Sequence, residues 1–172
     1  RLVDHCHEVH FSERVTEYHG KDGRVAALKT EKGEYPVDAV INAIGFIPNN
    51  QLGKEHLKLF KNGAYLVDRR QQTSDPDVYA IGDCATVYSN ALQEVTYIAL
   101  ATNAVRSGII AGHNIGGTEL ETIGVQGSNG ISVFGYNMVS TGLSVKAAVK
   151  AGLEVSYTDY EDLQRPGFMK EN

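Results

Sequence analysis

The sequence predicts an α/β protein, and three stretches of its 172 residues support that prediction. Val37–Ile44 is almost continuously apolar, which is typical of a strand buried on both faces of a sheet. Val78–Ile81 is a second short apolar run, with turn formers before it and Gly82 after it. Tyr97–Ile115 carries apolar residues at helical spacing and stops at Gly116-Gly117, a common C-terminal signal. We therefore expect buried strands together with one long helix.

Composition excludes several classes of protein. With 42% hydrophobic and 22% charged residues, the chain can bury a core and is typical of a soluble protein. A net charge of -5 offers no basic surface, so we expect no nucleic-acid partner. The apolar runs are too short to span a bilayer and the first residues do not resemble a signal peptide, so we expect no membrane association. The two cysteines, Cys6 and Cys84, lie far apart, which fits a reducing cytoplasm.

The first part of the chain favours β-structure. Val3–Phe11 alternates imperfectly and indicates a polar edge strand. Arg14–Tyr18 and Arg24–Leu28 flank the turn-forming segment Gly20–Gly23, which predicts a hairpin. No glycine-rich phosphate loop of the GxGxxG type precedes the later motifs, so we expect no complete dinucleotide-binding fold in this chain.

The expected elements after the Val37–Ile44 strand are mostly short. We expect a short helix over Gln51–Phe60 and a second one over Ser144–Ala151, with Ser144 as its N-cap and Gly152 as its end. The expected strands are Gly63–Asp68, Ile131–Phe134, Met138–Thr141 and Leu153–Tyr157. Loops are expected over Ser89–Gln93 and, at the end of the chain, over Asp159–Asn172. For the long helix, we expect the spacing of Ile98, Ala101, Val105 and Ile109 to mark an apolar side.

A histidine-rich segment near the start is a weak candidate for a metal site. On a strand, His5 and His7 would share one face, and His10 and Cys6 lie close by in the sequence. Structural zinc needs four well-spaced ligands, and no Cys-x-x-Cys or second ligand pair accompanies this cluster. We therefore expect no metal site.

The stretch Thr73–Thr86 carries the strongest functional signal. Its apolar run ends on Gly82-Asp83, which would place a carboxylate just past a strand, where α/β sheets bind ligands. Asp83 could accept hydrogen bonds from sugar-like hydroxyls, and Gly82 would let the ligand approach the backbone. The small apolar start of the following helix, Ala99-Leu100-Ala101, would admit a flat ring beside unpaired N–H groups.

Several ordered motifs make the chain similar to a known family. It resembles the pyridine nucleotide-disulfide oxidoreductases, in the branch that contains NADH oxidase, NADH peroxidase and coenzyme A-disulfide reductase. The segment Cys84–Leu92 favours the NADH oxidases within that branch. The matching segments are Ala43–Asn49, Asn62–Asp68, Thr73–Ala85 (the second FAD motif), Ile98–Ala104, Gly124–Gly130 and Ser140–Leu143.

The resemblance implies two cofactors, FAD and NADH, and a set of contacts for each. Asp83 would hold the ribityl or phosphate side of FAD, with Gly82 and Leu100 beside it, and Ala101 would direct a backbone N–H toward the flavin. Gly45, Ala99 and Gly130 would line the side on which the nicotinamide of NADH stacks. Hydride would pass from NADH to the flavin and then to oxygen, a peroxide or a disulfide.

The departures from the family pattern are equally informative. The family's redox cysteine, its first FAD phosphate loop and its NADH loop are not found in this sequence, so no catalytic residue is expected here and the cysteine is expected upstream. Cys84 has no nearby partner thiol and is expected to be inert. Ile47 replaces the usual arginine before Pro48, which removes a positive charge from the nucleotide side.

The resemblance also implies a domain organisation. Residues 1–46 would end an NADH-binding domain, 47–122 would be the C-terminal half of an FAD-binding domain, and 123–172 would begin a dimerisation domain. The expected fold is thus α/β with α+β pieces, part of a flavoprotein with two dinucleotide-binding domains, acting as a cytoplasmic homodimer. Two alternatives stay open: NADH peroxidase or coenzyme A-disulfide reductase, or a catalytically inert dimerisation or scaffold module.

Overall fold

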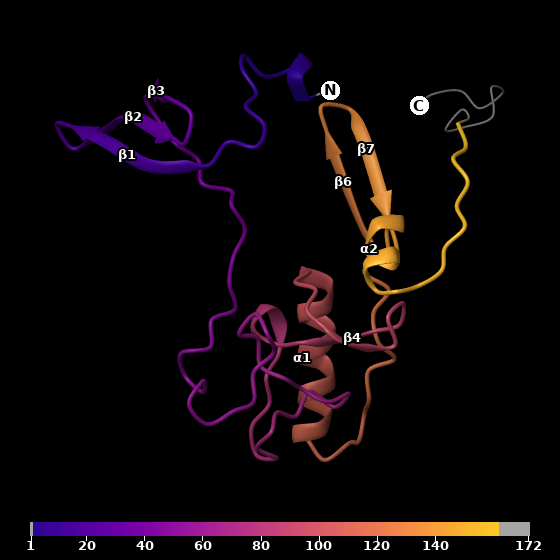
Figure 1. Cartoon of the computed structure of the whole chain (residues 1–172). Helices are drawn as coiled ribbons and strands as arrows, with labels where there is room; N and C mark the ends of the chain where they lie inside the picture. The colour runs from indigo at the N-terminus through magenta and orange to yellow at the C-terminus, as the bar shows by residue number, and fades with distance from the viewer. Residues whose placement is uncertain (1, 162–172) are drawn as a thin grey trace. The chain divides into compact units, whose positions relative to one another are not determined.

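The computed structural model describes residues 2–161, and the chain separates into two compact units, Arg1–Phe46 and Ile47–Asn172 (Figure 1). Helices and strands occur together, as the α/β prediction requires. None of the described helices is long and apolar enough to cross a membrane. The assignment of the units to particular cofactor domains stays a prediction.

The first unit is built on a three-stranded antiparallel sheet. Its strands are β1 (Val15–Lys21), β2 (Arg24–Thr30) and β3 (Glu34–Pro36), in the order β1-β2-β3. The predicted hairpin is confirmed, and its turn is made by Asp22 and Gly23 with φ values of 52° and 75°. Two consecutive residues with positive φ match the right-handed twist of the flanking strands, which explains the Asp-Gly pair.

Two strands expected in this unit do not form. Val3–Phe11 contains only the short 3-10 helix η1 (Leu2–Asp4) followed by bends, and Val37–Ile44 is extended chain without a ladder. Ile41 and Ile44 are each 92% exposed, so the prediction of a strand buried on both faces was wrong. The reason is that a strand needs hydrogen-bonded neighbours along its length, whereas the bond from Val37 N to Ala26 O of β2 at 3.0 Å does not continue into a ladder.

The second unit has a small core made largely by irregular segments. Tyr65, Val67, Ala80 and Ala85 form the buried cluster, and Leu57, Leu59 and Cys84 pack against it. The predicted strands Gly63–Asp68 and Val78–Ile81 are wrong, since these segments make only isolated bridges, Leu59 with Tyr65, Tyr65 with Ala85, and Gln72 with Tyr79. Two of the residues expected to be buried, Val78 and Ile81, are 37% and 43% exposed.

Successive turns replace the predicted helix over Gln51–Phe60. The carbonyl of Asn50 accepts hydrogen bonds from the N–H groups of Gly53 and Lys54, and the carbonyl of Gly53 accepts from Leu57. The Tyr65 hydroxyl fixes this segment by donating to Asn50 O at 2.8 Å and accepting from Gly53 N at 2.9 Å. A tyrosine from the core therefore holds the turns in place.

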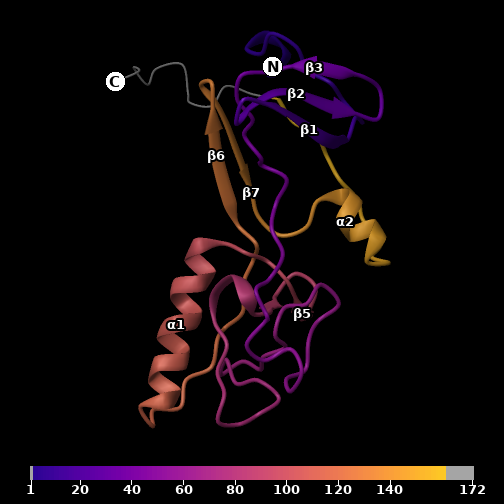
Figure 2. The ribbon, with the colours of Figure 1, turned by 90° about the vertical axis from the view of Figure 1, so that its left-hand side faces the viewer.

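The longest helix is α1 (Ala101–Ile115), which Figure 2 shows in side view. It begins four residues later than predicted, because Leu100 adopts extended geometry as the N-cap. Its buried residues are Ser107, Ile110 and Ala111, whereas Val105 and Ile109 are 65% and 54% exposed, so the expected apolar side was misplaced. The predicted end is confirmed, with Gly116 as C-cap and a positive φ of 84° at Gly117.

After α1 the chain returns along the second unit. The Asn114 side-chain amide donates to the carbonyls of Ile110 and Leu120, and Thr122 N donates to Arg69 O at 2.8 Å. Val125 then bridges in parallel to Ser89 at the end of β4 (Val87–Ser89). β4 itself pairs with β5 (Glu94–Thr96) around the loop Asn90–Gln93.

The remaining elements are a hairpin and a short helix. The two predicted strands are confirmed, and they pair as the hairpin of β6 (Asn129–Val133) and β7 (Tyr136–Ser140), with the turn at Phe134-Gly135. α2 (Val145–Lys150) is capped as predicted, because Ser144 Oγ accepts from Ala147 N at 3.2 Å. It ends at Lys150 with Ala151 as the C-cap, and Gly152 follows with a φ of 78°. The predicted strand Leu153–Tyr157 is wrong, and most of the predicted loop 159–172 lies outside the described residues.

Substitution by alanine should have opposite effects on stability at Gly112, inside α1, and at Gly117, just after its end. A Cβ added at either Gly112 or Gly117 would meet nothing within 4 Å, so only the backbone distinguishes them. Gly112 is inside the helix, and Gly112→Ala should stabilise the protein by about 0.5–1 kcal/mol. Gly117 has a positive φ, and Gly117→Ala should destabilise it by about 1 kcal/mol or more. Urea unfolding of both variants measures the difference, and equal shifts would contradict it.

Candidate functional site

The Gly82-Asp83 pair lies directly against the first turns of α1. It begins the 3-10 turn η2 (Gly82–Cys84). Gly82 N donates to Ser107 Oγ at 3.0 Å, and that hydroxyl donates to Ala104 O at 2.8 Å. Gly82 has a φ of 70°, while an added Cβ would make only an ordinary 3.7 Å contact with Ala104. The glycine is therefore required by backbone conformation rather than by lack of space.

Asp83 presents its carboxylate at the surface while its backbone is held from behind. The Tyr97 hydroxyl donates to Asp83 O at 2.8 Å. Burial raises the pKa of Tyr97, and the nearby negative charge of Asp83 raises it further, so this hydroxyl stays a donor at neutral pH. Asp83 is exposed, and no side chain among residues 2–161 donates a hydrogen bond to its carboxylate. The carboxylate is available to accept from a ligand.

The start of α1, the helix on which η2 packs, supplies further hydrogen-bond donors. Leu100 O accepts from Asn103 N and Ala104 N at 2.9 and 3.0 Å, and no side chain caps the helix. Within the described chain, the N–H groups of Ala101 and Thr102 have no acceptor, and both residues are exposed. Unpaired N–H groups at a helix start carry a partial positive charge. An acceptor-rich or anionic group can therefore bind there.

The structure thus brings together four of the seven residues that the sequence identified as cofactor contacts. Gly82 and Asp83 lie on η2, and Leu100 and Ala101 begin the helix on which η2 packs. The arrangement differs from the expected one, since the apolar run before Gly82 is not a regular sheet strand. A glycine that admits close approach, a carboxylate acceptor and two N–H donors are suited to a ligand with hydroxyl groups and a polar ring edge.

The other three predicted residues lie on separate elements. Ala99 is half-buried just before α1. Gly130 lies in β6 opposite Val139, and both are exposed. Gly45 belongs to the first unit, where it is exposed with a φ of 88° and would meet no atom within 4 Å if it carried a Cβ. Their common role at a nicotinamide stays a prediction.

The cysteines and the histidine cluster add no redox or metal geometry to this site. Cys84 is half-buried against the core, and its thiol donates to Ile81 O at 3.2 Å. Both cysteines are free thiols, and Cys6 is exposed in the other unit. Among residues 2–161, no group of three or more His, Cys, Asp or Glu side chains is placed to hold a metal ion.

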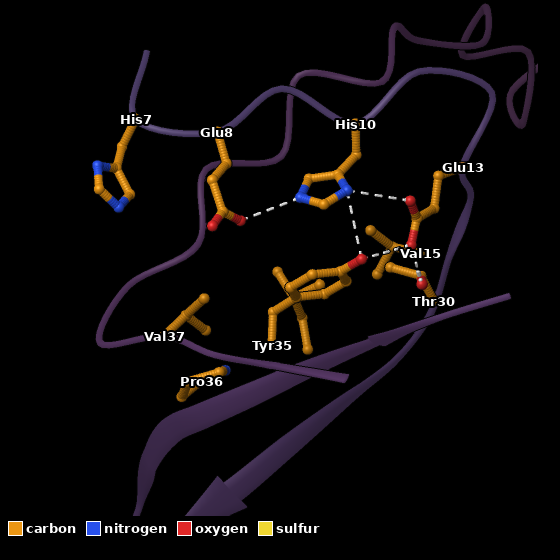
Figure 3. A pocket seen from close by; sticks show the side chains of 10 residues that line it. His7, Glu8, His10, Glu13, Val15, Thr30, Tyr35, Pro36 and Val37 are labelled. Carbon is orange, nitrogen blue, oxygen red and sulfur yellow. Dashed lines mark hydrogen bonds and ion pairs between the residues drawn. The ribbon is translucent and has the colours of Figure 1, made fainter. Parts of the chain in front are cut away.

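A polar cluster in the first unit escaped the sequence analysis. Glu13 accepts hydrogen bonds from Thr30 Oγ1 at 2.5 Å and Tyr35 Oη at 2.9 Å, and His10 Nδ1 lies 3.3 Å from its other carboxylate oxygen. Figure 3 shows these four side chains together. His10 Nε2 in turn faces Glu8 at 3.2 Å. The Glu13 side chain is 5% exposed. Its hydroxyl partners come from strands 17 and 22 residues away, so no local pattern could indicate the cluster.

The contacts of this cluster shift the titration of its members. The hydrogen bond from Thr30 lowers the pKa of Glu13 most, and Tyr35, His10 and Lys32 lower it further against the opposing effect of burial. The same Glu13 carboxylate raises the pKa of Tyr35. The network therefore fixes an ionised carboxylate between two neutral hydroxyls and holds the segment before β1 against the sheet.

This shift predicts how stability depends on pH. Because the pKa of Glu13 is lower in the folded state, its contribution is complete above the ordinary glutamate pKa of about 4.3. The contribution is lost as the pH falls through that value to the lower folded-state pKa. Urea unfolding of the first unit, followed between pH 7 and pH 3, should show a steeper loss in the native protein than in Glu13→Gln.

A matched control is Glu31→Gln. Glu31 lies in the turn next to Thr30, is exposed, and makes no side-chain hydrogen bond to the Glu13 cluster. This variant should keep the native pH dependence. An identical acid profile for native protein and Glu13→Gln would show that the carboxylate is not preferentially ionised by folding.

Comparison with known proteins places this geometry in context. The sequence profile described as "Pyridine nucleotide-disulphide oxidoreductase" matches residues 6–108. The NADH oxidase of Lactococcus lactis subsp. cremoris is 63% identical over 99% of this chain, and the NADH oxidase of Enterococcus faecalis is 40% identical over 98%. These alignments cover 39% and 38% of the two relatives, so the chain spans well under half of their length.

Solved structures of similar proteins share the fold. A water-forming NADH oxidase from Lactobacillus brevis bound to NADH matches 91% of this chain and 35% of its own chain, with a TM-score of 0.83 and 38% identity. An NAD-dependent persulfide reductase from A. fulgidus matches 83% of this chain and 27% of its own, with a TM-score of 0.76 and 31% identity. Both neighbours are oxidoreductases of mixed α and β content, which confirms the predicted class at that level.

Proposed function

The chain belongs to the pyridine nucleotide-disulphide oxidoreductase family, and from this premise we propose that it is part of an FAD-dependent NADH oxidase. One observation carries the proposal. The Asp83 carboxylate lacks a donor within the described chain and lies beside the uncapped start of α1, where two N–H groups lack acceptors. A non-catalytic scaffold would not need a free carboxylate beside free N–H groups, whereas an FAD-binding protein would use both to hold the cofactor.

The donor set fits FAD on chemical grounds. The Asp83 carboxylate would accept hydrogen bonds from the ribityl hydroxyls, and the absence of a side chain at Gly82 would let the backbone pass close to them. The N–H groups of Ala101 and Thr102 would face the polar edge of the ring, with Leu100 beside it. When bound, FAD supplies the redox chemistry by accepting hydride from NADH and passing electrons to oxygen.

The protein's own residues would position these groups. The Tyr97 hydroxyl holds the Asp83 backbone, and Ser107 holds Gly82, so carboxylate and helix start keep a fixed relation. Gly45, Ala99 and Gly130 would line the nicotinamide side, where a larger side chain would obstruct stacking. Ile47, which is 86% exposed, would leave that side without the family's arginine. Cys84 would have no redox role.

The family relation also guides the proposed assembly. The first unit would end an NADH-binding domain, residues 47–122 would complete the FAD-binding domain, and 123–172 would begin the dimerisation domain of a cytoplasmic homodimer. The division of the chain between Phe46 and Ile47 supports the first of these boundaries. The redox cysteine would lie in another part of the full-length polypeptide.

Product analysis tests the activity. The full-length polypeptide carrying this segment, loaded with FAD, should consume oxygen when NADH is added, with NADH and oxygen measured together. Consumption of hydrogen peroxide instead would indicate an NADH peroxidase, and reduction of coenzyme A-disulfide would indicate the corresponding reductase. A purified full-length protein that binds FAD but oxidises no NADH with any of the three acceptors would contradict the proposal.

Replacing the proposed anchor tests the site. Asp83→Asn in the full-length enzyme removes the charge that strengthens hydrogen bonds to the ribityl hydroxyls, so the FAD dissociation constant should rise about 10- to 100-fold. Flavin fluorescence on dilution measures it. Asp77→Asn is the control, because Asp77 is exposed in the preceding turn and lies outside the site. Equal FAD affinity in the two variants would remove Asp83 from the site.

A further inference from the structure

A small, partly open cavity lies between α1 and the segments of the second unit that pack against it. Asn103, Arg106, Ser107 and Ile110 of α1 line one side, and Gln71 and Thr122 are among the residues that line the other. Its volume is about 20 Å³, and a cavity needs roughly 10–15 Å³ on this measure to hold one water molecule. The cavity therefore has room for a single water and for nothing larger.

Gln71 lines this cavity and carries an unsatisfied acceptor. Gln71 is 3% exposed, and its Oε1 is the buried side-chain polar atom that no described residue supplies with a hydrogen bond. Its backbone is fixed, since Gln71 N donates to Asp68 O and Gln71 O accepts from Ala80 N, both at 3.2 Å. Its φ of 69° is uncommon for a residue other than glycine. A buried acceptor held in this way needs a partner.

We propose that this cavity is a binding site for one ordered water molecule, through which Gln71 positions α1. The water would donate a hydrogen to Gln71 Oε1. It would accept from a donor with a hydrogen to spare on α1, either the Asn103 amide, which already gives one hydrogen to Ile98 O, or the Arg106 guanidinium. The site rests on the geometry alone, and its positioning role rests on the proposed FAD function.

Other occupants do not suit the lining. None of the described residues that line the cavity carries a carboxylate, thiol or imidazole, and the basic residue Arg106 is among them, so a metal cation would find a positive charge nearby without compensating ligands. An anion would face the carbonyl oxygen of Gln71, which is an acceptor and repels it. Water can donate to one side and accept from the other, which matches both kinds of group.

The position of the cavity connects it to the proposed cofactor site. Ser107 lines the cavity and also accepts the hydrogen bond from Gly82 N. The carbonyl of Gln71 accepts a hydrogen bond from the N–H group of Ala80, and Ala80 lies two residues before Gly82. A water joining Gln71 to α1 would therefore tie together the two elements that hold Asp83 and the helix start. It would limit their relative movement without touching the cofactor.

A crystal structure of the full-length, FAD-loaded enzyme at a resolution that reveals ordered water tests the site directly. We expect density for one water within hydrogen-bond distance, about 2.7–3.2 Å, of Gln71 Oε1. An empty cavity, or a protein donor on Oε1, would overturn the proposal. This result does not depend on activity, so it separates failure of the water site from failure of the NADH oxidase assignment.

Gln71→Met tests the positioning role, because methionine has similar length, retains the backbone strain and cannot bind water in this way. We expect the water density to disappear and the FAD dissociation rate to rise about two- to fivefold, the change that one neutral hydrogen bond is worth. The urea midpoint should not increase. An increased midpoint would mean that Oε1 is truly unpaired in the native protein and would overturn the site.

Gln72→Met is the matched control. Gln72 carries the same side chain one residue later, but its amide donates to Pro76 O at 3.1 Å on the surface and does not line the cavity. This variant should keep both the water density and the native FAD dissociation rate. Equal FAD dissociation rates for Gln71→Met and Gln72→Met would overturn the positioning role.

Discussion

The packing of the Gly82-Asp83 turn on the start of α1 is the constraint on which the second unit's chemistry depends. It is held at two points, by the hydrogen bond from Gly82 N to Ser107 Oγ and by that from Tyr97 Oη to Asp83 O. Both bonds use backbone atoms of the turn. The Asp83 carboxylate consequently remains available to a ligand, because the turn is held through its main chain and not through this side chain.

The same turn is joined to a core that contains few regular strands. Tyr65 bridges to Ala85, just after η2, and its hydroxyl organises the turns near Asn50. A core built from bridges and turns relies on side-chain hydrogen bonds more than a continuous sheet does, because fewer backbone groups pair in ladders. This explains why buried polar residues such as Thr86 and Ser107 make side-chain hydrogen bonds there. Thr86, for example, accepts a hydrogen bond from Val67 N.

Local signals in the sequence predicted local structure well. The Asp-Gly turn of the first hairpin, the Gly116-Gly117 stop of α1 and the Ser144 cap of α2 each follow from the conformational preference of one or two residues, and each is confirmed. The proximity of Gly82-Asp83 to the helix start was also expected. In contrast, the clusters around Glu13 and Gln71 join residues far apart in the sequence, and no local preference encodes them.

The unsuccessful strand predictions have a different cause. An apolar run such as Val37–Ile44 indicates the environment that a segment is suited to, whereas a strand forms only when neighbours accept its hydrogen bonds. The described chain supplies no ladder for this run, which is therefore extended and exposed. The chain spans 39% of its Lactococcus relative. Under the proposed function, the apolar run Val37–Ile44 would pair with strands from the rest of the full-length fold, which would account both for its apolar sequence and for its exposure in this chain.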